Sequence, residues 1–243
     1  MLERFSRYWR QPHWHTLLVM SLLCLGHSVS YAKPTQGAPA QADIAPHIAT
    51  LKPYQTHITK KFEEFSPLVD EIFKQLSKRS LPESLVLVPM LESSYNPKAV
   101  SPAKAAGLWQ LMPATAKRFG LIVEQNLDQR FDIEPSTQAA MQYLSFLYRK
   151  FEGDINLTLA AYNAGEGRVQ RAINKAGSRE FSKLKLPNET VHYVRRFYAL
   201  MSLVDISSLK GNHVDTLWLF ASEPSWQQAP LIDLTPLPPL ISL

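Results

Sequence analysis

The sequence predicts an all-α protein, and three observations support this prediction. Apolar residues recur at spacings of three and four, which is the stripe of an amphipathic helix. Prolines and glycines, of which the chain has 18 and 9, stand mainly where such stripes begin and end. No segment alternates apolar and polar residues as a half-buried strand does. We therefore expect a bundle of short helices joined by proline and glycine turns.

The expected helices follow one another along most of the chain. The first carries a stripe from Phe62 to Leu76, and a second follows the capping-box pattern Ser80-Leu81-Pro82-Glu83 and ends near residue 92. Further helices are expected at 113–120, 135–153, 155–165 and 191–204.

Residues 1–32 have the pattern of a secretory signal peptide. Arginines precede a short apolar run at 17–26, and Ser30 and Ala32 occupy the minus-three and minus-one positions of a cleavage site. The run is short for a membrane-spanning helix, which favours a cleaved signal peptide. The alternative is an uncleaved membrane anchor. The only cysteine, Cys24, lies in this segment, so we expect no disulfide in the exported protein. The expected location is the periplasm.

Three further segments are predicted. Residues 33–47, rich in Pro, Ala and Gln, are expected to form a flexible linker. Residues 48–206 are expected to form the helical body, and the proline-rich residues 207–243 an irregular tail. The net charge of +5 comes without a block of Lys and Arg, so no nucleic-acid partner is predicted.

Glu92 is the first candidate for catalysis, because it ends the apolar run LVLVPML. A carboxylate there is poorly solvated and lies near the negative end of the helix dipole. Both effects disfavour the ionised form and raise the pKa. A glutamate with a pKa near neutrality can donate a proton to a glycosidic oxygen and take one back. The alternative is that Glu92 simply faces water.

Two other motifs carry polar and aromatic side chains next to glycines. In GLWQLMPAT, Gly107 allows close backbone approach, Trp109 offers a flat face to a sugar, and Gln110 offers a donor and an acceptor. Alternatively, this segment is a turn that packs its tryptophan into the core. In AAYNAGEGRV, Tyr162 can donate to a carboxylate, and Asn163 can bind an amide or end the helix.

Taken together, the segments ESSYNPKAVSPAKAAGLWQLMPATA, AAYNAGEGRV and LPNETVHYV resemble the family 1 lytic transglycosylases in order and spacing. The resemblance covers about 65–206 and points to the membrane-bound D subgroup. It implies the soluble-transglycosylase catalytic domain, a lysozyme-like fold related to goose-type lysozymes. Each motif by itself has low specificity, whereas their common order is a specific signal.

The resemblance also implies a role for each matched residue. Glu92 would be the catalytic acid and base, positioned with the help of Ser93. Tyr162 and Asn163 would orient Glu92 and contact N-acetyl groups. The residues implied to bind substrate are Ser93, Gly107, Leu108, Trp109, Gln110, Thr115, Tyr162, Asn163, Glu189 and Tyr193. Among them, Gln110 would contact the glycan, Leu108 and Trp109 would line the groove, and Glu189 and Tyr193 would close its far wall.

The implied reaction cleaves the β-1,4 bond between MurNAc and GlcNAc in peptidoglycan and leaves a 1,6-anhydro end. The implied reaction needs no metal and no cofactor, which is consistent with the lack of a cluster of Cys, His and Asp at ligand spacing in the sequence. The expected partners are glycan strands and a component of the cell-wall machinery, with the chain itself a monomer. Two alternatives remain: a hydrolytic muramidase, which needs a second carboxylate near a water, and a catalytically inactive scaffold that binds peptidoglycan.

Overall fold

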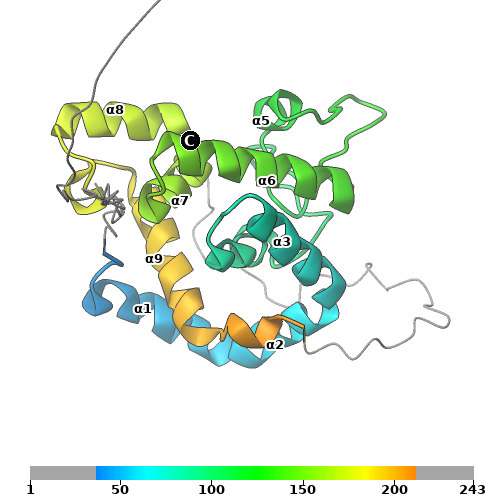
Figure 1. The fold of residues 1–243 in the computed structure, drawn as a ribbon, viewed down its shortest axis with the longest axis horizontal. Coiled ribbons are helices and arrows are strands. Elements are labelled where there is room, and N and C mark those ends of the chain that lie inside the picture. The colour runs from blue at the N-terminus through cyan, green and yellow to red at the C-terminus, as the bar shows by residue number, and fades with distance from the viewer. Residues whose placement is uncertain (1–36, 212–243) are drawn as a thin grey trace, which may run out of the picture. The chain divides into compact units, whose positions relative to one another are not determined.

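Every regular element of residues 37–211, the part of the chain that this computed structural model describes, is a helix (Figure 1). The expectation of an all-α protein is therefore confirmed for this part. The predicted signal peptide and nearly all of the predicted tail lie outside the described residues. In chain order the elements are α1 (Gln41–Leu51), η1 (Lys52–Tyr54), α2 (Gln55–Glu64), α3 (Ser66–Lys78), η2 (Glu83–Leu87), α4 (Val88–Ser93), α5 (Pro113–Arg118), α6 (Ile133–Lys150), α7 (Ile155–Ala164), α8 (Glu166–Ala176), η3 (Phe181–Lys183), α9 (Asn188–Leu203) and η4 (Ser207–Leu209).

The helices are arranged around the segment that leads to Glu92. In Figure 1, α6, α7, α9, α1 and α2 surround the region that holds α3. The helix α9 contacts α1, α7, η2 and α4, and α3 contacts both η2 and α6. Residues 85–88 are completely buried, because this segment is packed from several sides. Apolar burial of this kind stabilises the fold and also includes the first turn of α4.

Residues 41–47, the last part of the predicted flexible linker, lie in the helix α1 instead, while residues 37–40 have no regular structure. From Gln41 onward the chain forms α1, which packs along α9. Ile44 is 6% exposed, and Asp43 pairs with Arg195 of α9 at 2.7 Å. The composition is misleading here, because alanine is a strong helix former and the apolar residues Ile44, Ile48 and Leu51 pack α1 against the core.

The predicted helix with the stripe from Phe62 to Leu76 is two helices. The break falls at Phe65, whose φ of −100° and ψ of 20° leave the helical region. Pro67 follows in the first turn of α3, where its missing N–H costs no hydrogen bond. The apolar side chains of both helices remain buried, so the stripe was correctly assigned to the core although the single helix was not.

The predicted helix that ends near Glu92 also differs from the structure. Residues 83–87 form the 3₁₀ element η2, and α4 begins only at Val88. Ser80 lies in the left-handed region with φ 52°, so the predicted capping box is not formed. Pro89 stands in the first turn of α4. A new helix therefore begins where the proline lacks a donor, and the chain does not kink within one helix.

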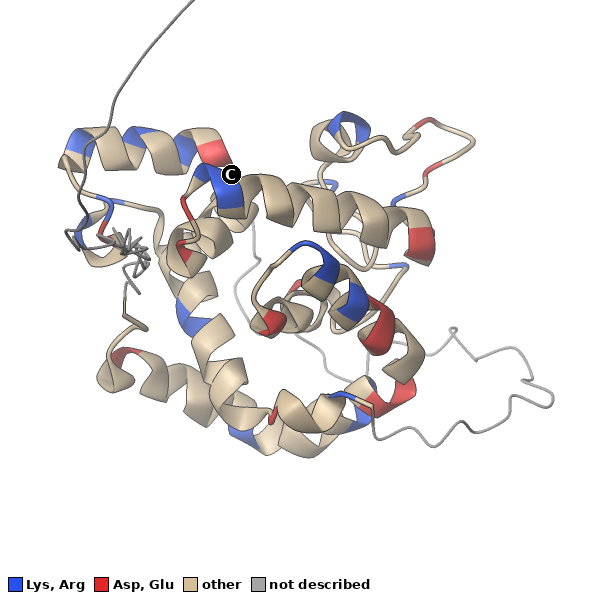
Figure 2. Ribbon diagram, viewed as in Figure 1, with Lys and Arg blue, Asp and Glu red and all other residues tan. Residues whose placement is uncertain are grey.

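The helices predicted at 113–120, 135–153, 155–165 and 191–204 correspond to α5, α6, α7 and α9. The helix α8 was not predicted separately. It carries the exposed basic side chains Arg168, Arg171 and Lys175. In Figure 2 the charged positions of α8 after its first turn are blue, whereas α3 has both blue and red positions.

Candidate active site

Glu92 lies in the last turn of α4, and the helix is ended immediately after it. Ser94 and Tyr95 both adopt the left-handed conformation, with φ of 51° and 62°. Tyr95 is completely buried, and its hydroxyl donates to the carbonyl of Val86 at 3.0 Å. The backbone around Glu92 is therefore held by packing on one side and by this hydrogen bond on the other.

The carboxyl group of Glu92 has a pKa raised to about 7. Burial is the largest cause, because it disfavours the charged form, and the nearby charge of Glu189 adds to it. The hydroxyl of Tyr193 donates to Oε1 of Glu92 at 2.6 Å and lowers the pKa, as does the charge of Arg196. Glu92 as a whole is half-buried while its carboxyl is surrounded by protein atoms. The predicted rise in pKa is thus confirmed, and desolvation is its main source.

The hydrogen bond from Tyr193 leads to a prediction about this pKa. Tyr193→Phe removes a donor that stabilises the ionised carboxylate, so the pKa of Glu92 is expected to rise above 7 by on the order of one unit. Titration of the labelled carboxyl carbon by NMR measures this directly. Tyr54→Phe, at an exposed tyrosine, is the control. An unchanged pKa in Tyr193→Phe would contradict the role assigned to the hydroxyl.

Arg196 also belongs to this site, although none of the sequence motifs indicates it. Its side chain is 8% exposed, and burial lowers its pKa, while Tyr193, Glu92 and Glu189 act on it as neighbouring charges in the opposite direction. The spacing in the sequence could have indicated it, because Arg196 follows Tyr193 by three positions on one helix and therefore lies on the same face.

Two side chains near Glu92 hold the loop of residues 99–111. The hydroxyl of Ser93 donates to the carbonyl of Leu108 at 2.8 Å. The hydroxyl of Tyr162, on α7, donates to the carbonyl of Trp109 at 2.8 Å. The hydroxyl of Tyr162 is therefore engaged by the loop, and the hydrogen bond to Glu92 comes from Tyr193 instead.

Leu108 and Trp109 do not line a groove, which corrects the expectation from the resemblance. Both side chains are completely buried, and the indole N–H of Trp109 donates to the hydroxyl of Thr137 at 3.0 Å. The alternative interpretation, a turn that packs its tryptophan into the core, is the correct one. A large aromatic side chain whose N–H is satisfied gains more from burial than from exposure.

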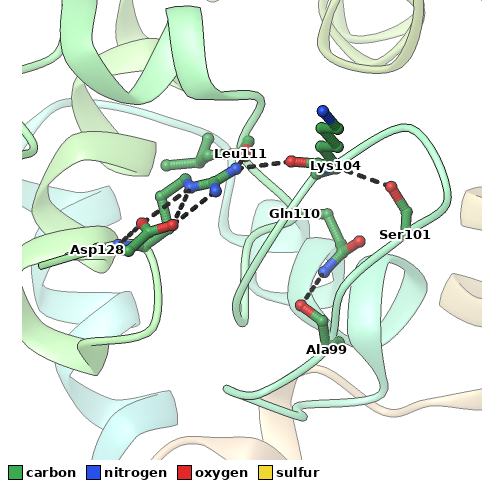
Figure 3. Close-up of polar contacts among 8 residues, drawn as sticks. Ala99, Ser101, Lys104, Gln110, Leu111 and Asp128 are labelled. Carbon is green, nitrogen blue, oxygen red and sulfur yellow. Dashed lines mark hydrogen bonds and ion pairs between the residues drawn. The ribbon is translucent and has the colours of Figure 1, made fainter. Parts of the chain in front are cut away.

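Gln110 has a defined orientation. Its side-chain nitrogen donates to the carbonyls of Ala99 at 3.1 Å and Gly107 at 2.8 Å, and Figure 3 shows the contact with Ala99. Since both partners are carbonyl oxygens, the amide nitrogen must face them. Both donors are thereby used, and the oxygen of the half-buried Gln110 is left as an acceptor.

Three further predicted site residues, Glu189, Asn163 and Thr115, lie on the helices α9, α7 and α5. Glu189 stands in the first turn of α9, one turn before Tyr193, and its charge acts on Glu92. Asn163 follows Tyr162 near the end of α7 and is half-buried. Thr115 is half-buried on α5, and the described hydrogen bonds do not connect it to Glu92.

Residues 37–211 contain neither a group of metal-ligating side chains nor a membrane-spanning helix. Within this range no three His, Cys, Asp or Glu side chains are grouped so as to hold a metal ion. None of the helices in the same range has both the length and the hydropathy needed to cross a membrane.

Comparison with known proteins identifies the part of the chain that contains Glu92. Residues 71–185 match the family model "Transglycosylase SLT domain". The chain is 42% identical over 169 residues to membrane-bound lytic murein transglycosylase D of Escherichia coli K12, an alignment that covers 68% of this chain and 37% of the relative. It is 33% identical over 123 residues to the soluble lytic murein transglycosylase of the same strain, which covers 48% of this chain and 19% of the relative. The chain thus spans well under half the length of these relatives.

A solved structure shares the fold. The 70-kDa soluble lytic transglycosylase in complex with bulgecin A matches with a TM-score of 0.51 and 24% identity, over 73% of this chain and 33% of that one. The helical arrangement of the described residues is therefore the lysozyme-like fold of that protein, as the sequence predicts.

Proposed function

We propose that this chain, which carries a transglycosylase SLT domain and belongs to that family, cleaves the β-1,4 bond between MurNAc and GlcNAc in peptidoglycan as a lytic transglycosylase. The observation that carries the proposal is the carboxyl group of Glu92, buried, hydrogen-bonded by Tyr193 and with a pKa of about 7. A group with this pKa is present in both protonation states near neutral pH, as an acid that must later act as a base requires.

Glu92 acts twice in the proposed reaction. As an acid it transfers its proton to the glycosidic oxygen while the bond from that oxygen to C1 of MurNAc breaks. The 2-acetamido group of the same sugar stabilises the positive charge that develops at C1. As a carboxylate, Glu92 then accepts the proton of the C6 hydroxyl, and that oxygen bonds to C1 to close the 1,6-anhydro ring. Glu92 is protonated again, and no water is consumed.

Tyr193 supports both steps from one position. Its hydroxyl donates to Oε1 of Glu92 and so keeps the carboxyl group in one orientation through the proton transfers. The charge of Arg196 opposes the effect of burial. Together they keep the pKa of Glu92 near 7, and burial without them would raise it further.

Substrate contacts are proposed for the half-buried polar residues around Glu92. The oxygen of Gln110 would accept a hydrogen bond from an amide N–H or a hydroxyl of the glycan, since its nitrogen is already engaged. Asn163 and Glu189 would contact the glycan on the α7 and α9 sides. Ser93 and Tyr162 would act through the loop backbone, and Leu108 and Trp109 by packing beneath it.

The products of digestion test this function. Purified protein incubated with intact murein sacculi is expected to release muropeptides lighter by about 18 Da, the mass of one water, than hydrolysis products. Mass spectrometry over a time course measures this. Products with reducing ends would assign the chain to the muramidases instead, with Glu189 as the second carboxylate to test. Binding of sacculi without any product would support a non-catalytic scaffold.

The cellular setting is proposed on the same basis. We infer that residues 1–32 direct export to the periplasm, where the helical body acts as a monomer on glycan strands, alone or with a component of the cell-wall machinery. The body is taken to extend from α1 rather than from residue 48, because α1 packs on α9.

A further inference from the structure

Arg130 lies between α5 and α6 and is nearly completely buried, at 7% exposure. Its Nη1 donates to the carbonyls of Lys104 at 2.7 Å and Leu111 at 3.0 Å. Its Nη2 and Nε contact the carboxylate of Asp128 at 2.6 and 2.9 Å. Figure 3 shows the contacts with the carbonyl of Lys104 and with the carboxylate of Asp128. The guanidinium thus joins two points of the 99–111 loop to the segment of Asp128 and Arg130.

The loop is also closed on itself and lies directly on the backbone of Arg130. The amide of Gly107 donates to the carbonyl of Ala99 at 2.8 Å, and Ala106 and Leu111 exchange backbone hydrogen bonds at 3.2 Å. A side chain at Gly107 would place its Cβ 1.8 Å from the carbonyl oxygen of Arg130. These hydrogen bonds and this close approach fix the backbone of the loop against the backbone of Arg130.

The opposite side of the loop faces the candidate catalytic centre. Ser93, the neighbour of Glu92, holds the carbonyl of Leu108, and Tyr162 holds that of Trp109. Gln110 follows directly and precedes Leu111, which Arg130 holds. The position of Gln110 is therefore set between Ser93 and Tyr162 on one side and Arg130 on the other.

We propose that Arg130, paired with Asp128, is a positioning residue that holds Gln110 at a fixed place relative to Glu92 for glycan binding; this inference rests on the function proposed above. Only arginine offers a planar fork that can reach a carboxylate and two carbonyls at once. The hydrogen bond from Arg130 also lowers the pKa of Asp128, so the pair stays ionised at neutral pH. Lysine keeps the charge but supplies a single nitrogen.

Arg130→Lys and Asp128→Asn test the proposal in the full chain. The first measurement is amide hydrogen exchange, where faster exchange is expected across 99–111 and unchanged exchange in α6. The second is calorimetric affinity for tetra-N-acetylchitotetraose, which is expected to fall on the order of ten- to a hundredfold. In turnover of solubilised glycan strands, KM is expected to rise while kcat changes much less, because Glu92 and Tyr193 lie on other elements.

Arg118→Lys is the matched control, since Arg118 pairs with Glu166 at 2.5 Å on the surface and holds no part of the loop. It is expected to change neither exchange in 99–111 nor affinity. Unchanged loop exchange or unchanged affinity in both Arg130→Lys and Asp128→Asn would overturn the proposal, as would a fall confined to kcat. Exchange and affinity do not depend on turnover. Failure of the wild-type chain to cleave sacculi therefore counts against the proposed function, while these two readouts still decide the role of Arg130.

Discussion

Glu92→Gln is expected to lower glycan cleavage by at least about a thousandfold while the fold stays intact. The amide has nearly the same volume as the carboxyl group and still accepts the hydrogen bond from Tyr193. The amide has no acidic proton to transfer to the glycosidic oxygen at neutral pH, and it cannot accept the proton of the C6 hydroxyl in the second step. A neutral side chain also suits the buried position, because burial is what disfavours the charge of Glu92.

The measurement is the rate of muropeptide release from sacculi by purified Glu92→Gln, with circular dichroism and thermal unfolding to establish that the variant is folded. Glu63→Gln makes the same chemical change at an exposed position of α2 and should leave the rate as in the wild type. Release at a near wild-type rate by folded Glu92→Gln would show that another group is the acid. Glu189 would then be examined next, since its charge acts on the same site.

Gly107→Ala is expected to reduce the free energy of unfolding by on the order of 3–5 kcal/mol. Two causes act together. Gly107 has φ of 76°, a conformation that L-residues adopt at a cost of about 1 kcal/mol. The added Cβ would also lie 1.8 Å from the carbonyl oxygen of Arg130, so the loop must move away from the backbone on which it packs. That movement weakens the hydrogen bonds of Arg130 to the loop as well.

Gly120→Ala separates these two causes. Gly120 has φ of 90°, yet a Cβ there meets no atom within 4 Å. Its substitution is expected to cost only the conformational part, about 1 kcal/mol. Urea unfolding followed by circular dichroism gives both values. Equal losses in Gly107→Ala and Gly120→Ala would mean that the close approach at Arg130 is relieved without cost.

Much of the fold was predictable because it depends on local patterns. The stripe from Phe62 to Leu76 is recognisable from apolar spacing, since these side chains line one buried face. The boundaries at Phe65 and Val88 are not, because a proline allows a helix either to kink or to restart and the sequence does not say which. The helix α1 was missed because its burial depends on α9, far along the chain.

The site divides in the same way. The sequence by itself determined that Glu92 ends a buried apolar run, and from this a raised pKa follows, since desolvation of a carboxyl group depends mainly on its immediate surroundings. Only the tertiary structure decided that Tyr193, 101 positions away, donates to Glu92 and that Tyr162 does not. The packing of α9 against α4 brings that hydroxyl within 2.6 Å of the carboxylate, and no local pattern encodes such a distance.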